Sequence, residues 1–149
     1  MTTCRHHLPG FRPTCLGIGA IFVLLAAGEL VRGVPDSMAG FGVPDAVLTA
    51  PHYQDAMVWV FVHMLVLGLI IGVVGHVAEG TRTRMAFARL MLGCIGIFTV
   101  LDVRSSDSFL GNGLYAGARS LVPPVIDLVV LLLFAHLSWC RSASMQPHD

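Results

Sequence analysis

The chain has 149 residues, of which 55% are hydrophobic and only 12% are charged. A soluble domain carries roughly 25% charged residues, about twice the share found in this chain. The composition therefore excludes a disordered chain and argues against a soluble globule, which leaves an integral membrane protein. The net charge is zero, and the nine Lys or Arg residues are all arginine. We find no basic tail or patch of the kind that binds nucleic acid.

Four apolar stretches follow one another along the chain, each close to the roughly 20 residues that cross a bilayer as a helix. They cover about residues 15–31, 56–78, 85–103 and 123–140. Apolar residues lie on all faces of these stretches, as in membrane-spanning helices. We therefore predict an all-α fold, with residues 1–149 forming one membrane-spanning four-helix bundle. A cleaved signal peptide is the alternative interpretation of the first stretch.

The arginines are divided unequally between the two predicted sides of the membrane. With the N-terminus inside, six arginines are cytoplasmic and three are outside. Because arginine favours the cytoplasmic side, we predict that both termini are cytoplasmic and that the protein lies in the inner (plasma) membrane. The cytoplasmic group is Arg5, Arg12, Arg82, Arg84, Arg89 and Arg141, and the outer group is Arg32, Arg104 and Arg119.

Several ionisable residues lie inside the predicted spans, where each costs roughly 2.5–3.5 kcal/mol and needs a partner or a function. At about 1.5 Å per residue, His63 and Asp127 reach a similar depth, and we expect them to face each other. The group near the outer face, here called the outer cluster, is Glu29, His63, Asp102 and Asp127, with Arg104 and Arg119 above it. This cluster is either a set of interhelical contacts that fixes packing or a site for a small molecule or ion.

Two further histidines, His76 and His136, lie near the predicted cytoplasmic face at depths within about 5 Å of each other. Histidines that face each other on neighbouring helices can hold haem through its two axial positions. A histidine near a helix end can equally extend toward water or bond a carbonyl group. The pair is therefore a candidate haem site, with a purely structural role as the alternative.

Three glycines, Gly68, Gly72 and Gly75, form a small-residue face on the second predicted helix. Such a face lets another helix approach closely. The neighbour can belong to this chain, to a second copy or to another membrane protein. We expect the face to pack tightly, and it indicates no activity by itself.

No motif for catalysis or for metal binding stands out. The chain has no phosphate-binding loop, nucleophile elbow or zinc-protease helix. The cysteines and histidines near the termini (Cys4, His6, His7 and His148) make an incomplete ligand set, so we expect no metal site. These observations favour a protein without catalysis of its own.

The helix layout resembles the small four-helix membrane proteins of the BphX-like and DoxX-like group. The second predicted helix opens with Asp55-Ala-Met-Val-Trp59 and continues through Leu67-Gly68, and the fourth opens with Ser120-Leu-Val-Pro-Pro-Val-Ile126. The similarity covers about residues 14–140 and concerns helix spacing. It implies a small accessory membrane protein and transfers no catalytic residue.

Three functions remain open at this point. We expect a small integral protein of the inner membrane that contacts the lipid bilayer and serves as a non-catalytic accessory or partner-binding subunit. The first alternative is a binding or permeation site for a small molecule or ion, lined by His63 and Asp127. The second is a membrane anchor associated with haem or quinone.

Overall fold

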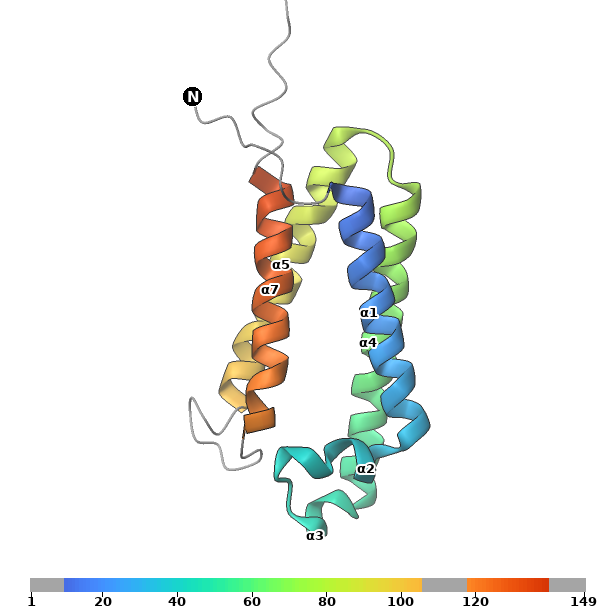
Figure 1. Cartoon of the computed structure of the whole chain (residues 1–149), viewed down its shortest axis with the longest axis vertical. Coiled ribbons are helices and arrows are strands. Elements are labelled where there is room, and N and C mark those ends of the chain that lie inside the picture. The colour runs from blue at the N-terminus through green and yellow to red at the C-terminus, as the bar shows by residue number, and fades with distance from the viewer. Residues whose placement is uncertain (1–9, 106–117, 140–149) are drawn as a thin grey trace, which may run out of the picture.

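The computed structural model describes residues 10–105 and 118–139. Within these ranges the regular structure is entirely helical, which confirms the predicted all-α class. The elements are α1 (Phe11–Arg32), α2 (Val34–Met38), η1 (Ala39–Phe41), α3 (Asp45–Leu48), α4 (Pro51–Val77), α5 (Thr81–Ser105), η2 (Ala118–Leu121) and α7 (Val122–Trp139). Four long helices run side by side and the short ones gather at one end (Figure 1).

The four long helices are long and apolar enough to cross a membrane. The candidate spans are Phe11–Arg32, Pro51–Val77, Thr81–Arg104 and Arg119–Trp139. All four begin a few residues before the predicted stretches, because hydropathy falls at polar residues that the helix still includes. The chain is therefore a multi-pass membrane protein with the predicted four-helix architecture.

Proline and glycine set several helix boundaries. Pro51 begins α4, and Pro123 and Pro124 lie in the first turn of α7, where a missing N–H breaks no helical hydrogen bond. Gly33 follows α1 with φ of 83°, and Gly80 lies in the α4–α5 turn with φ of 77°. Such positive φ angles are strained for other residues, so glycine permits both changes of direction.

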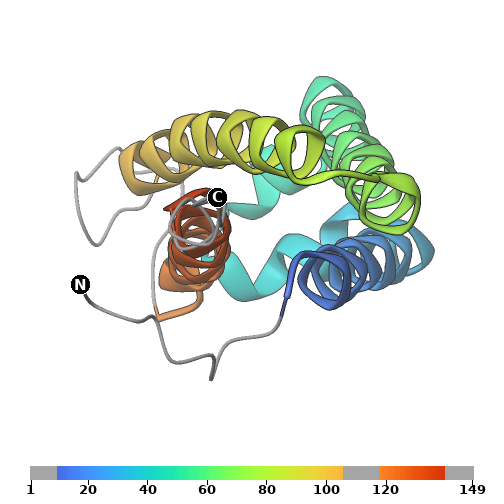
Figure 2. The ribbon, with the colours of Figure 1, turned by 90° about the horizontal axis from the view of Figure 1, so that it is seen from above.

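The long helices form two pairs. Helix α1 packs mainly against α4, and α5 packs mainly against α7, whereas contact between the two pairs is much sparser. The view from above shows the separation between them (Figure 2). Glycines allow α1 and α4 to approach closely. A Cβ added at Gly19 would lie 2.7 Å from the backbone oxygen of Gly68. A Cβ added at Gly68 would lie 2.9 Å from the backbone oxygen of Gly19.

The predicted glycine face of α4 is thus used inside the chain. Gly68 packs on α1 at Gly19, and Gly75 packs on Cys15. The backbone nitrogen of Gly72 also lies close to α1, but a Cβ added at Gly72 would have no atom within 4 Å. Helix α1 therefore lies against this face at Gly68 and Gly75, and the binding of a partner there stays a prediction.

Aromatic rings join the two pairs near the end at which α1 begins, here called the α1-start end. Phe87 lies edge-on to Phe11, with centroids 6.2 Å apart, and edge-on to Phe134, with centroids 6.4 Å apart. These rings come from α5, α1 and α7, and Phe134 is fully buried. A second apolar cluster at the other end packs the short helices against α4 through Val34, Met38, Val43, Leu48 and Phe61.

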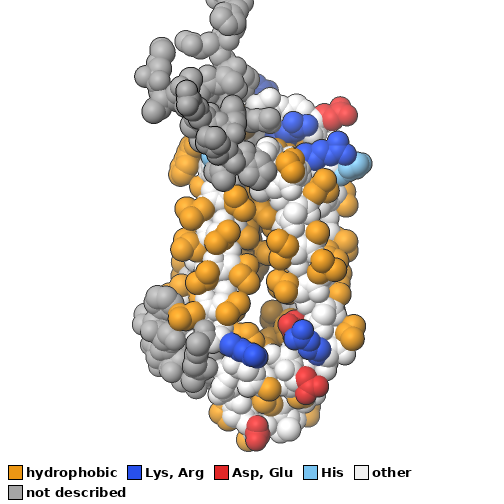
Figure 3. All heavy atoms as spheres, in the orientation of Figure 1, with side chains coloured by type: hydrophobic (Ala, Val, Ile, Leu, Met, Phe, Trp, Pro, Cys, Tyr) orange, Lys and Arg blue, Asp and Glu red, His pale blue; other side chains and the backbone are white. Residues whose placement is uncertain are grey.

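The rest of the helix surface is apolar and exposed. In the most apolar window of α4 and of α5, only 17% of the residues are buried within the protein. Figure 3 shows hydrophobic side chains along the length of the helices, with charged side chains mostly at the two ends. This distribution is what a bilayer requires of surfaces that face its acyl chains.

Candidate functional site

Two aspartates meet across the α5–α7 interface inside the membrane-spanning part. Asp102 lies near the end of α5 and Asp127 in the second turn of α7, and their half-buried side chains lie within hydrogen-bonding reach of each other. One oxygen of Asp127, Oδ2, is buried and receives no hydrogen bond from any residue the structure describes. The outer cluster thus contains a carboxyl pair, Asp102–Asp127, rather than the predicted His63–Asp127 pair.

A carboxyl pair has definite chemistry. Two ionised carboxylates are acceptors only, so a hydrogen bond between them requires a proton on one of them. Like charges a few ångströms apart in a medium of low polarity also favour sharing one proton. A proton shared between the two carboxyl groups would therefore join α5 to α7 at membrane depth.

His63 does not reach this pair. Its Nδ1 donates a hydrogen bond to the carbonyl oxygen of Trp59, one turn earlier on α4, at 2.6 Å. The two rings also lie 5.6 Å apart between centroids. Both side chains are exposed on the outside of the bundle, so the expected contact of His63 with Asp127 is absent among the described residues. His63 and Asp127 therefore do not face each other.

Glu29 lies where α1 ends and the short helices begin. Its Oε1 is 3.7 Å from Nη1 of Arg32, while its buried Oε2 has no hydrogen-bond partner within the described ranges. Its backbone oxygen accepts hydrogen bonds from the Gly33 N–H and from Oγ of Ser37, each at 3.1 Å. The carboxylate therefore sits at a sharp bend, paired with a neighbour on its own helix.

The two predicted outer arginines have different surroundings. Arg104 is exposed at the end of α5. The side chain of Arg119, in η2, occupies the space that a side chain at Gly40 would take, with its Cδ 2.7 Å from that Cβ position. Arg119 thus rests on η1 and connects the short helices to the start of α7, and no ion pair of either arginine with Asp102 or Asp127 is found in the described part.

The candidate haem ligands lie on helices from different pairs. His76 on α4 is exposed, and its Nδ1 is 2.9 Å from Nη2 of Arg12 on α1. His136 on α7 is half-buried. With Nδ1 bonded to Arg12, only Nε2 of His76 is free to bind a metal. Haem binding stays a prediction, and no group of three or more potential metal ligands occurs within residues 10–105 and 118–139.

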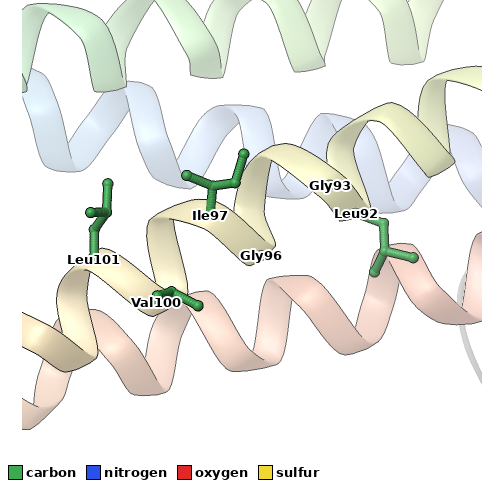
Figure 4. A pocket seen from close by; sticks show the side chains of 6 residues that line it. All are labelled: Leu92, Gly93, Gly96, Ile97, Val100 and Leu101. Carbon is green, nitrogen blue, oxygen red and sulfur yellow. The ribbon is translucent and has the colours of Figure 1, made fainter.

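Two apolar hollows accompany these polar groups. A groove of about 260 Å³ separates the helix pairs, lined by Ile18, Ile21 and Phe22 of α1 and by Val125, Ile126, Val129, Val130 and Leu133 of α7. We call it the α1–α7 groove, and Figure 3 shows the slit in this region. A more open hollow of about 350 Å³ lies on α5, over Gly93 and Gly96 (Figure 4).

Sequence reasoning missed two features of this site. The Arg12–His76 contact joins residues 64 positions apart, and no pattern links them. The α1–α7 groove depends on which helices pair, which hydropathy does not encode.

Cys4, His6, His7 and His148 lie outside the described residues.

The resemblance in helix layout to the BphX-like and DoxX-like group stays a prediction. No family model, curated protein or solved structure matches the chain.

Proposed function

We propose that this chain is a small, non-catalytic protein of the inner membrane that acts as a partner-binding subunit. The observation that carries the proposal is the α1–α7 groove, an apolar opening between two separately packed helix pairs. Both termini are then cytoplasmic, as the arginine distribution predicts. The resemblance in helix layout to the BphX-like and DoxX-like group also supports an accessory role.

The groove takes an apolar occupant, and we infer that this is a helix of another membrane protein. All eight lining residues are apolar, so water inside would find no hydrogen-bond partners. At this depth the occupant is an acyl chain or a side chain of another membrane protein. Helices associate in bilayers largely through van der Waals packing, and a preformed groove offers more contact than a convex helix surface.

Site-specific photo-crosslinking in intact membranes tests the proposal. A photoreactive residue replaces Ile21, which lines the groove, and in a matched control it replaces Leu69, which is exposed on α4. We expect one protein adduct of defined mass from position 21 and no protein adduct from position 69. A second substitution, Val129→Trp, fills the groove from α7 and should abolish that adduct. Equal labelling at both positions, or an adduct unaffected by Val129→Trp, contradicts a groove-bound partner.

A second candidate function rests on the Asp102–Asp127 pair. A proton shared at membrane depth can be exchanged for an ion or a cationic solute, which makes the pair a candidate permeation or binding site in the outer half of the bundle. Proton flux into liposomes containing the purified protein, followed with a pH-sensitive dye, tests it. We expect flux in the unmodified protein and its loss in Asp127→Asn. Flux equal to that of empty liposomes contradicts this second function.

A further inference from the structure

Arg12 and His76 form an interhelical pair at the α1-start end. The guanidinium group only donates hydrogen bonds, so Nδ1 of His76 is the acceptor in the 2.9 Å contact. The imidazole is therefore neutral, with its proton on Nε2. Arg12 keeps its charge and its other N–H donors, and both side chains are exposed. The pair thus presents donors from two helices at one place.

Tight packing of α1 on α4 next to this pair fixes its position. Cys15, one turn after Arg12, lies against Gly75, which directly precedes His76. A larger residue at Gly75 would collide with the Cβ of Cys15. The two helices are therefore held close beside the pair, so little freedom remains to be lost when a ligand binds to it.

Two more arginines complete a basic surface at this end. Arg84 at the start of α5 donates from Nε to the carbonyl oxygen of Ala78 at 3.0 Å, and its guanidinium carbon lies 5.8 Å from the centre of the Phe11 ring. Arg82 is exposed. We call Arg12, His76, Arg82 and Arg84 the basic rim. Glu79, which is exposed, is the only carboxylate in this part of the described structure.

The basic rim lies above an apolar flank. Leu16 on α1 and Val73 and Val77 on α4 are large hydrophobic residues that are 40%, 58% and 60% exposed. Leu16 and Val73 lie about one turn from Arg12 and His76, respectively, toward the middle of the membrane-spanning helices, and Val77 directly follows His76. Figure 3 shows basic side chains, a histidine and an acidic side chain gathered at the upper end, above hydrophobic side chains. Cations above an apolar surface match a ligand with an anionic head and an apolar tail.

We propose that the basic rim binds the phosphate headgroup of an anionic phospholipid, with Arg12 and His76 as direct donors and the acyl chain on the apolar flank. Arginine matches phosphate geometry through paired N–H donors. The rim lies at the level of the headgroups when the long helices span the bilayer. A basic residue near an anionic membrane surface strengthens binding about fivefold. The site needs no partner protein and is independent of the α1–α7 groove.

Quenching of tryptophan fluorescence by brominated lipids tests the proposal on the full chain. Trp139 ends α7 at the α1-start end, and Trp59 lies toward the other end of the bundle. The chain has two tryptophans, so Trp59→Phe leaves a reporter at the rim end and Trp139→Phe one at the other. Brominated phosphatidylglycerol is titrated against brominated phosphatidylcholine. We expect the anionic lipid to be preferred several-fold at Trp139 and less at Trp59.

Substitutions then assign the preference to the rim. Arg12→Gln should reduce it about fivefold, whereas the matched control Arg32→Gln, at the other end of α1 and paired with Glu29, should leave it unchanged. If Arg12→Gln does not fold, as judged by helicity, Arg82→Gln tests the same rim from an exposed position. A preference that survives these substitutions overturns the proposal. The proposal is also overturned if inorganic phosphate, added to the protein in neutral lipid, shifts the thermal unfolding temperature as much as the anionic lipid does. The site would then not select lipid.

Discussion

The close approach of the α1 and α4 backbones yields a sharp prediction for Gly19. Alanine at this position would place its Cβ 2.7 Å from the backbone oxygen of Gly68 and 2.8 Å from the backbone nitrogen of Gly72. Ordinary contact begins at 3.4 Å, so α1 and α4 must separate by roughly 0.7 Å. Backbone atoms cannot rotate away as the end of a side chain can. Overpacking of this kind typically costs about 1–3 kcal/mol.

Gly17 on the same helix provides the matched control. A Cβ there meets nothing within 4 Å. Gly17→Ala should therefore stabilise the protein slightly, by about 0.5–1 kcal/mol, because alanine restricts the unfolded chain more than glycine does. The two alanine variants should differ in free energy of unfolding by about 1.5–4 kcal/mol.

Reversible unfolding in mixed micelles, followed by circular dichroism, measures this difference. The companion pair on α4 repeats the test: Gly68→Ala meets Phe22 Cβ at 2.8 Å, whereas Gly72→Ala meets nothing within 4 Å. If Gly19→Ala is as stable as Gly17→Ala, the close α1–α4 approach does not exist in solution and the pairing of helices described above is wrong.

Other substitutions can be followed by the same unfolding measurement. Phe134→Ala removes a fully buried ring from the aromatic junction of the two pairs and should cost about 3–5 kcal/mol. His63→Leu should change stability by less than about 0.5 kcal/mol, since the ring is exposed and bonds only its own helix; a larger loss would reveal an interhelical contact. Asp102→Leu leaves Asp127 without its hydrogen-bonded partner and should cost about 1–3 kcal/mol. Asp102→Asn supplies an N–H donor and should be close to neutral, and equal effects of these two variants would argue against the shared hydrogen bond.

The membrane-spanning segments could be predicted from the sequence because their cause is local. An apolar run of sufficient length has no alternative in a bilayer to a hydrogen-bonded helix. Their ends were less accurate: the first stretch was placed at about residues 15–31, and α1 covers Phe11–Arg32. Arg12 lowers the hydropathy there, yet a long side chain can extend into the headgroup region while its backbone stays helical.

The sequence places His63 beside Asp127, whereas the structure places Asp102 beside it. Counting residues gives position along a helix axis, and it placed His63 and Asp127 at the same level. It does not give rotation about the axis, and each residue adds about 100° to that angle. His63 consequently faces away from the bundle, and Asp102 is the residue that meets Asp127. The candidate site retains its carboxylates and loses its histidine.

Rotation is harder to predict in this chain than in a soluble bundle for a physical reason. In water the polar side of a helix marks the surface, but in a bilayer the buried and lipid-facing sides are both apolar. In a membrane helix the small residues, and not the polar ones, indicate which side packs on a neighbouring helix, because small residues permit the two backbones to approach closely. The glycines of α4 marked a packing face correctly, but Gly17 and Gly19 on α1 look equivalent in sequence. Only the assembled pair distinguishes them, which is why comparing their alanine variants tests the packing so directly.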